Sequence, residues 1–240
     1  MTEFEVRCVF SHPDFYLVDK PAGIGFHDDE IQGQRRLGVF NLCAQALGET
    51  LFPVHRLDKL TSGLMLLARN KEAAAWFQRA FELRHIEKLY LALSDRKPKK
   101  KQGSVIGDME KARASAWKLT KSKTSPALTK FFSWGLDTEL KGLGIFLVKP
   151  ETGKTHQIRV ALKSLGSPIL GDALYGGGEA DRGYLHAYGL RFHYRDETFC
   201  FYCYPDLGHW FKMAEQQIKG NTQDGFDLPW PNQSRKLQEY

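Results

Sequence analysis

A dense group of charged and polar residues lies between positions 55 and 63, directly before an apolar run. Within it, Asp58 stands between Arg56 and Lys59, two cations that favour the ionised form of its carboxyl group. An ionised carboxylate at the start of a buried strand can act as a nucleophile, a general base or an electrostatic stabiliser. A turn in which Asp58 caps backbone N–H groups would use the same residues structurally, and for an isolated Arg-x-Asp this is the commoner outcome.

A second polar segment, residues 151–159, leads into a predicted helix that starts near Thr155. Helical spacing puts Ile158 and Leu162 on an apolar stripe, with Arg159 and His156 on the opposite, polar face. That face, together with the N–H groups of the helix start, would bind a phosphate or position a carboxylate. On periodicity alone, a solvated basic face is the alternative.

Tyr90 belongs to a third segment, residues 88–92, which the pattern predicts to be a strand. A tyrosine in that place can stack on a nucleobase or serve as an acid or base. Packing of a half-buried ring against the sheet is the alternative interpretation.

The cysteine and histidine patterns argue against a metal site. Four cysteines are too few for a disulfide framework, which favours a reduced, cytoplasmic protein. Cys200 and Cys203 have metal-like spacing, but residues three apart in a strand point to opposite faces. The histidines form no HxxxH or HExxH pair, and no apolar run is long enough to span a bilayer.

The positive charge of the chain is local. The net charge is +6, and residues 96–130 alone hold eleven Lys or Arg against two acids. Its densest part is the run Lys97, Lys99, Lys100 and Lys101. A local cationic segment suggests a polyanionic partner, with nucleic acid the first candidate, while a solvated loop is the alternative.

The surrounding pattern mixes strands and helices without regular alternation, which predicts an α+β fold. A single domain, residues 1–240, is expected, with a basic insertion at about 95–130 and a C-terminal tail at about 206–240 that is loosely held after residue 221. Helices are expected at residues 37–47, 71–84, from 155, and 209–220. Strands are expected at residues 15–18, 63–68, 88–93, 114–119, 128–134, 144–148, 185–192 and 198–204.

Five segments, in this order along the chain, resemble the motifs of the RluA-type pseudouridine synthases. They cover roughly residues 13–205, and their joint occurrence is more specific than any one of them. The segments are Val18-Asp19-Lys20-Pro21-Ala22-Gly23; His55-Arg56-Leu57-Asp58 with Thr61-Ser62-Gly63; residues 88–92; residues 150–159 with 166–172 and Tyr175-Gly176; and Leu185-His186-Ala187.

The resemblance implies a bent, mainly antiparallel mixed sheet with flanking helices and loops around a central cleft. It also implies isomerisation of a uridine in structured RNA to pseudouridine, with no cofactor and no metal, after the base has left the stack. Many relatives carry an N-terminal S4 RNA-binding domain. Here the first motif begins at Val18, so no S4 domain is expected.

The resemblance also assigns roles. Asp58 would be the essential carboxylate, which attacks C1′ or abstracts the C2′ proton, and both routes stay open. Tyr90 would stack on the flipped uracil, and Arg159 would hold the carboxylate ionised. Expected RNA-binding residues are Arg56, Lys20, His55, Thr61, Lys154, His156, Gln157, Lys97, Lys99, Lys100 and Lys101.

Two hypotheses of other classes compete with this one. A catalytically silent RNA-binding or ribosome-assembly protein would explain the basic segment but gives no reason for Asp58, Tyr90 and Arg159 to occur together. A nucleoside or glycoside hydrolase usually shows a carboxylate pair or a metal. We therefore expect a cytoplasmic, monomeric enzyme that acts on a stem-loop of transfer or ribosomal RNA, with no membrane association.

Overall fold

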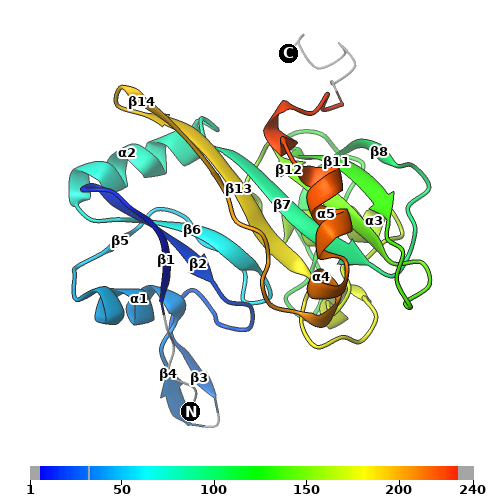
Figure 1. Ribbon diagram of the computed structural model, residues 1–240, viewed down its shortest axis with the longest axis horizontal. Helices are drawn as coiled ribbons and strands as arrows, with labels where there is room; N and C mark the ends of the chain where they lie inside the picture. Colours follow the sequence, from blue (N-terminus) through cyan, green and yellow to red (C-terminus); the bar gives the residue numbers. More distant parts are fainter. Residues whose placement is uncertain (1–5, 32, 232–240) are drawn as a thin grey trace. The chain divides into compact units, whose positions relative to one another are not determined.

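The computed structural model describes residues 6–31 and 33–231, which form two compact units of mixed strands and helices (Figure 1). Unit 1 comprises the described residues up to Glu87 together with residues 185–205, and unit 2 comprises residues 88–184 and the described residues from 206 onward. The α+β class is confirmed, because short helices alternate irregularly with mainly antiparallel strands. The expectation of a single domain stays a prediction. Among the described residues, no helix is long and apolar enough to cross a membrane.

The sheet of unit 1 has four strands in the order β1-β2-β6-β13, with β14 beside β13 and β5 beside β6. The pairs are antiparallel except for β6 and β13, which run parallel. The bounds are β1 Arg7–Ser11, β2 Phe15–Lys20, β5 Phe52–Pro53, β6 Ser62–Ala68, β13 Leu185–Tyr194 and β14 Glu197–Tyr202.

The core of unit 1 lies between this sheet and α2, Lys71–Glu82. The helix begins at Asn70, whose side-chain Oδ1 accepts from the N–H of Ala73 at 2.8 Å. Its buried face carries Phe77, which packs edge-on against Phe15. A second helix, α1 (Val39–Leu47), ends at Gly48, where a φ of 66° is the left-handed conformation that glycine adopts without strain. Both helices agree with the sequence.

Two strands of unit 1 form a separate hairpin, β3 (Asp29–Ile31) and β4 (Gln34–Arg36). Asp28 fastens this hairpin to the start of α1. Its Oδ1 accepts from the N–H of Gly38 at 2.9 Å and its Oδ2 from Arg35 Nη2 at 2.6 Å.

Gly63 makes the parallel pairing of β6 and β13 possible. Its φ is +104°, and a Cβ at this position would lie 2.3 Å from the carbonyl oxygen of Ala187. Only glycine therefore lets β6 begin this close to β13, and the start of β6 fixes the end of the loop that carries Asp58.

The sheet of unit 2 has the order β7-β12-β11-β8, and all its pairs are antiparallel. A two-stranded hairpin, β9 (Met109–Lys111) and β10 (Trp117–Leu119), forms a separate small sheet. The helix α3 (Gln157–Ser164) lies against β10, β11 and β12. The sheet strands are β7 Glu87–Ser94, which enters unit 2 at Lys88, β8 Gln102–Gly107, β11 Ala127–Gly135 and β12 Gly144–Pro150.

The basic segment is more structured than its composition indicates, since it contains β8, β9 and β10. The strand predicted at residues 114–119 is shorter than expected and starts only at Trp117. Ala114 and Ser115 have φ values of 54° and 60°, which place them in the turn of the β9–β10 hairpin.

The C-terminal helix is divided at Ala214 into α4 (His209–Met213) and α5 (Glu215–Thr222), and a short 3₁₀ turn, η2 (Gly225–Asp227), follows. The expectation of a loosely held tail is wrong for residues 222–231. Phe226 is 3% exposed, and the ring of Trp230 lies 5.0 Å from that of Phe132. Residues 232–240 lie outside the described part of the chain.

Candidate functional site

Asp58 lies in the loop between β5 and β6 of unit 1, as the sequence predicts. The N–H of Thr61 donates to the carbonyl oxygen of Asp58 at 3.0 Å, which closes a turn directly before the buried strand. The side chain of Asp58 is half-buried, and that of Arg56 is exposed. Lys59 turns to Asp29, where its Nζ meets Oδ2 at 2.9 Å. The loop thus presents a carboxylate and a cation at the end of a rigid strand.

Lys20 supports this loop from inside. Its side chain is fully buried, and its Nζ donates to the carbonyl oxygens of Thr61 at 2.7 Å and Pro21 at 2.8 Å. The N–H of Gly23 donates to the carbonyl oxygen of Lys59 at 2.7 Å. The turn after β2 and the loop before β6 therefore hold each other in place.

Two other motif residues of unit 1 face its interior. His55 Nε2 accepts from the N–H of Leu66 at 2.9 Å, and its ring stacks on Phe81 with centroids 4.6 Å apart. Thr61 is 2% exposed. Their placement fixes the loop on both sides of Asp58.

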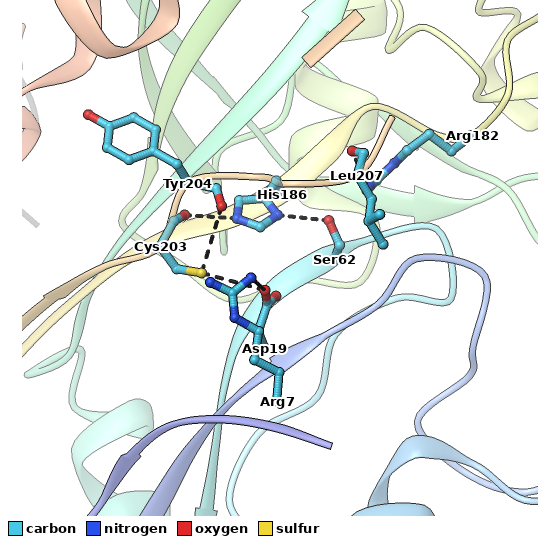
Figure 2. A network of polar contacts seen from close by, with 8 residues as sticks. All are labelled: Arg7, Asp19, Ser62, Arg182, His186, Cys203, Tyr204 and Leu207. Atoms are coloured by element: carbon cyan, nitrogen blue, oxygen red, sulfur yellow. Dashed lines mark hydrogen bonds and ion pairs between the residues drawn. The ribbon is translucent and has the colours of Figure 1, made fainter. Parts of the chain in front are cut away.

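A buried polar chain joins β6 to β13 behind the same loop, as Figure 2 shows. Ser62 Oγ lies 2.8 Å from His186 Nδ1, and His186 Nε2 lies 2.8 Å from the carbonyl oxygen of Cys203. A carbonyl only accepts, so His186 Nε2 carries a proton, and in the tautomer protonated at Nε2 alone Nδ1 would accept from Ser62. This serine–histidine pair resembles an activated nucleophile, but Ser62 is 4% exposed and enclosed. The Ser62–His186 pair therefore has a structural role, which is to hold β6 and β13 together.

Tyr90 lies on β7 of unit 2, opposite Val148 of β12, and its ring is half-buried. Leu89 and Leu91 on either side are fully buried. The strand predicted at residues 88–93 is confirmed, and alternation along it puts Tyr90 on the opposite face from Leu89 and Leu91. Its contact with a base stays a prediction.

Arg159 lies in the first turn of α3 in unit 2 and is 7% exposed. Its Nε donates to Asp172 Oδ2 at 2.7 Å and its Nη2 to Asp172 Oδ1 at 2.8 Å. The alternative of a solvated basic face is therefore wrong for Arg159. Asp172 was missed as a site residue, because Gly-Asp in the third motif is too common a pair to assign a role alone.

Of the remaining third-motif residues, Gln157 is buried and supports its surroundings, whereas Lys154 lies on the surface of unit 2. Gln157 is 5% exposed: its Oε1 accepts from Thr152 Oγ1 at 2.6 Å, and its Nε2 donates to the carbonyl oxygen of Leu128 at 3.0 Å. His156 lies at the start of α3 with its Nδ1 2.9 Å from the hydroxyl of Tyr175. Lys154 is exposed, with its Nζ donating to Ser125 Oγ at 3.1 Å.

The lysine run lies on the surface of unit 2, between β7 and β8. Lys97, Lys99, Lys100 and Lys101 are all exposed. Exposed ammonium groups on one short connection suit contact with a phosphate backbone. In the described residues, no group of three His, Cys, Asp or Glu side chains is arranged to hold a metal ion.

The chain resembles proteins of one family over most of its length. The family model described as RNA pseudouridylate synthase matches residues 14–164. An uncharacterized RNA pseudouridine synthase of Haemophilus influenzae is 50% identical over 212 residues, which cover 87% of this chain and 92% of that protein. Ribosomal large subunit pseudouridine synthase C of Rickettsia bellii is 34% identical over 70% of this chain and 56% of its own length. The solved structure of human RNA Pseudouridylate Synthase Domain Containing 1 superimposes with a TM-score of 0.70 and 25% identity, covering 84% of each chain.

Proposed function

The chain belongs to the RNA pseudouridylate synthase family, and on that premise we propose that it isomerises a uridine of ribosomal or transfer RNA with Asp58 as the essential carboxylate. One observation carries the proposal: the family match over residues 14–164 contains Asp58, Tyr90 and Arg159 in the motifs that resemble the family's own. The competing hypothesis of a silent RNA-binding protein needs none of the three.

The reaction breaks the C1′–N1 bond of the uridine and forms a C1′–C5 bond, so atoms balance without a co-reactant. The proton leaves C5, and N1 gains one. Asp58 would attack C1′ or take the C2′ proton, and either step needs an ionised carboxylate at the sugar. The position of Asp58 in a tight turn supports this role, since a nucleophile works best on a rigid element.

Arg159 and Tyr90 would complete the chemistry. Asp172 holds the Arg159 guanidinium through two hydrogen bonds within unit 2, and the family resemblance gives this cation the role of favouring an ionised Asp58. The half-buried ring of Tyr90 would stack on the flipped uracil. The two-point contact with Asp172 needs a planar guanidinium, because an ammonium cannot present two parallel N–H donors to one carboxylate.

RNA binding is assigned to exposed cations. We infer that Arg56, Lys154 and the lysine run contact phosphates, because all are exposed. Lys20, Thr61, His55 and Gln157 are buried or half-buried in contacts of their own units, so the proposal gives them support of the loops instead of direct RNA contact.

The substrate class follows from the family chemistry and the cationic segment. A flipped uridine in a stem-loop presents phosphates on both sides, and the name of the Rickettsia relative specifies ribosomal RNA. The proposal includes a cytoplasmic location, where these RNAs are modified, and action as a monomer, since each chain carries its own Asp58, Tyr90 and Arg159.

The test is a pseudouridine map of total RNA from cells with the gene, without it, and complemented by Asp58→Ala. We expect at least one site in ribosomal or transfer RNA to disappear without the gene, to return with the parent gene, and to stay absent with the Asp58→Ala variant. Identical pseudouridine maps in the strains with and without the gene would contradict the proposal.

A further inference from the structure

Tyr175 connects three separate segments of unit 2 through one hydroxyl group. It ends the 3₁₀ turn η1 (Ala173–Tyr175) and is 3% exposed. Its oxygen accepts from the backbone N–H of Trp117 at 2.9 Å, and it lies 2.9 Å from Nδ1 of His156. The hydroxyl therefore links the β9–β10 hairpin to the start of α3.

The ring of Tyr175 also lies against Arg159. The guanidinium carbon is 4.9 Å from the ring centroid, and Asp172, three residues before Tyr175, holds the edge of the same guanidinium. The N–H of Tyr175 donates to the carbonyl oxygen of Asp172 at 3.1 Å, so one turn carries both partners of the arginine. Arg159 is fixed at one edge and on one face by this turn.

The β9–β10 hairpin is held at its base, where the N–H of Thr120 donates to the carbonyl oxygen of Asp108 at 2.8 Å, and Tyr175 adds an attachment farther along β10. Each strand has three residues, and a hairpin of that size is only marginally stable alone. Its turn contains Ala114 and Ser115 in left-handed conformations, which are unfavourable for residues other than glycine. The bond from Trp117 to Tyr175 is such an attachment, and it ends at the residue that covers Arg159.

The charge of the hairpin suits RNA. It exposes Lys111, Arg113 and Lys118 against one acid, Glu110. The hairpin carries three exposed cations and, in the described residues, its two strands pair with no strand of the unit 2 sheet, so its attachments position it when a phosphate backbone docks on it.

We propose that Tyr175 is a positioning residue, whose hydroxyl sets the position of the RNA-docking β9–β10 hairpin relative to Arg159. The inference rests on the proposed function, which assigns the chemistry to Arg159. Loss of the hydroxyl then weakens productive docking of RNA, while the remaining ring and Asp172 still hold the guanidinium. Loss of the Tyr175 hydroxyl is therefore expected to raise KM more than it lowers kcat.

The test compares Tyr175→Phe with the parent, using 5-tritiated total RNA from a strain that lacks the gene. We expect KM to rise about fivefold or more, the effect of one lost hydrogen bond, with kcat within about twofold. Amide hydrogen exchange at Trp117 should speed up in the variant. Tyr194→Phe is the matched control, because Tyr194 is 4% exposed and donates to Asp14 at 3.1 Å in unit 1.

A second comparison shows whether the hydroxyl acts through the hairpin. In a background with Lys111, Arg113 and Lys118 all replaced by Gln, Tyr175→Phe should change KM by less than about twofold. An unchanged KM in the single variant, or fully additive effects in the combined one, would overturn the inference. A parent without tritium release would instead contradict the proposed function, and the exchange at Trp117 would still report on the hairpin attachment.

Discussion

Arg159 and Asp172 form a buried two-point ion pair: Nε meets Oδ2 at 2.7 Å and Nη2 meets Oδ1 at 2.8 Å. Their side chains are 9% and 2% exposed. Water screens neither charge, so each group depends on the other for its solvation. The pair explains how an arginine in the first turn of α3 is held rigid within unit 2.

The first prediction concerns this pair. Asp172→Asn leaves the guanidinium without its counter-charge, so the free energy of unfolding should fall by about 3–5 kcal/mol in urea denaturation. Arg159→Lys keeps a charge but reaches one oxygen, and its rate should drop by about 100-fold or more. A fully active Arg159→Lys variant would show that the two-point contact of the guanidinium has no part in the reaction.

The second prediction concerns Lys20. Lys20→Met keeps the length of the side chain but leaves the carbonyl oxygens of Pro21 and Thr61 without their buried donor. Stability should fall by about 1–3 kcal/mol, and tritium release should fall with it, because the loop of Asp58 loses its support. Lys71→Met, at an exposed position, is the control. Equal stability of the two variants would contradict the support role.

How far the sequence predicts the site depends on the kind of residue. The sequence predicts Asp58 in the loop directly before β6 and Tyr90 on β7, because each lies next to or within an apolar run that identifies a strand. The burial of Arg159 was not predictable from periodicity. It depends on Asp172, thirteen residues later, and on Tyr175, whose ring covers the guanidinium.

The sequence also predicts some elements of the fold better than others. Long apolar segments such as β6 and α2 agree with the sequence within two residues at each end. The β8 and β9 strands were missed, because short lengths hide their alternation, and the strand predicted at residues 114–119 is confirmed only over the three residues of β10. The turn at Ala114 and Ser115 was read as strand, since neither residue type signals a left-handed backbone.

The third prediction concerns the lysine run. Changing Lys97, Lys99, Lys100 and Lys101 to Gln should flatten the slope of log affinity against log salt by roughly 0.7–0.9 for each lost phosphate contact. The rate at saturating RNA should hold, since the run contains no proposed catalytic residue. Filter binding at several salt concentrations measures the slope. Changing the four exposed residues Lys71, Arg84, Lys141 and Lys212 to Gln instead controls for overall charge. Unchanged affinity and slope in the run variant would make the lysines a solubilising loop.

The fourth prediction is a pH dependence. The N–H of Gly38, followed by Arg35 and Asn41, lowers the pKa of Asp28 to about 2 from its ordinary 3.8. Because the folded-state pKa is the lower one, the stabilisation by Asp28 is complete above about pH 4 and is lost as the pH falls towards 2. Asp28→Asn should therefore lower Tm at pH 7 and lose that difference near pH 2. A Tm difference between the parent and Asp28→Asn that stays constant from pH 7 to pH 2 would contradict this prediction. The exposed Asp137, changed to Asn, is the control.

In the proposed reaction Asp58 carries the isomerisation, and tritium release from 5-tritiated RNA measures that step. Bonding of C5 to C1′ expels the C5 hydrogen, so each turnover releases one tritium to water. We expect release by the parent, none detectable with Asp58→Asn, and the same RNA affinity for the two proteins, because phosphate contacts supply most of the binding. An Asp58→Asn variant within tenfold of the parent, or a parent that binds RNA without releasing tritium, would contradict it.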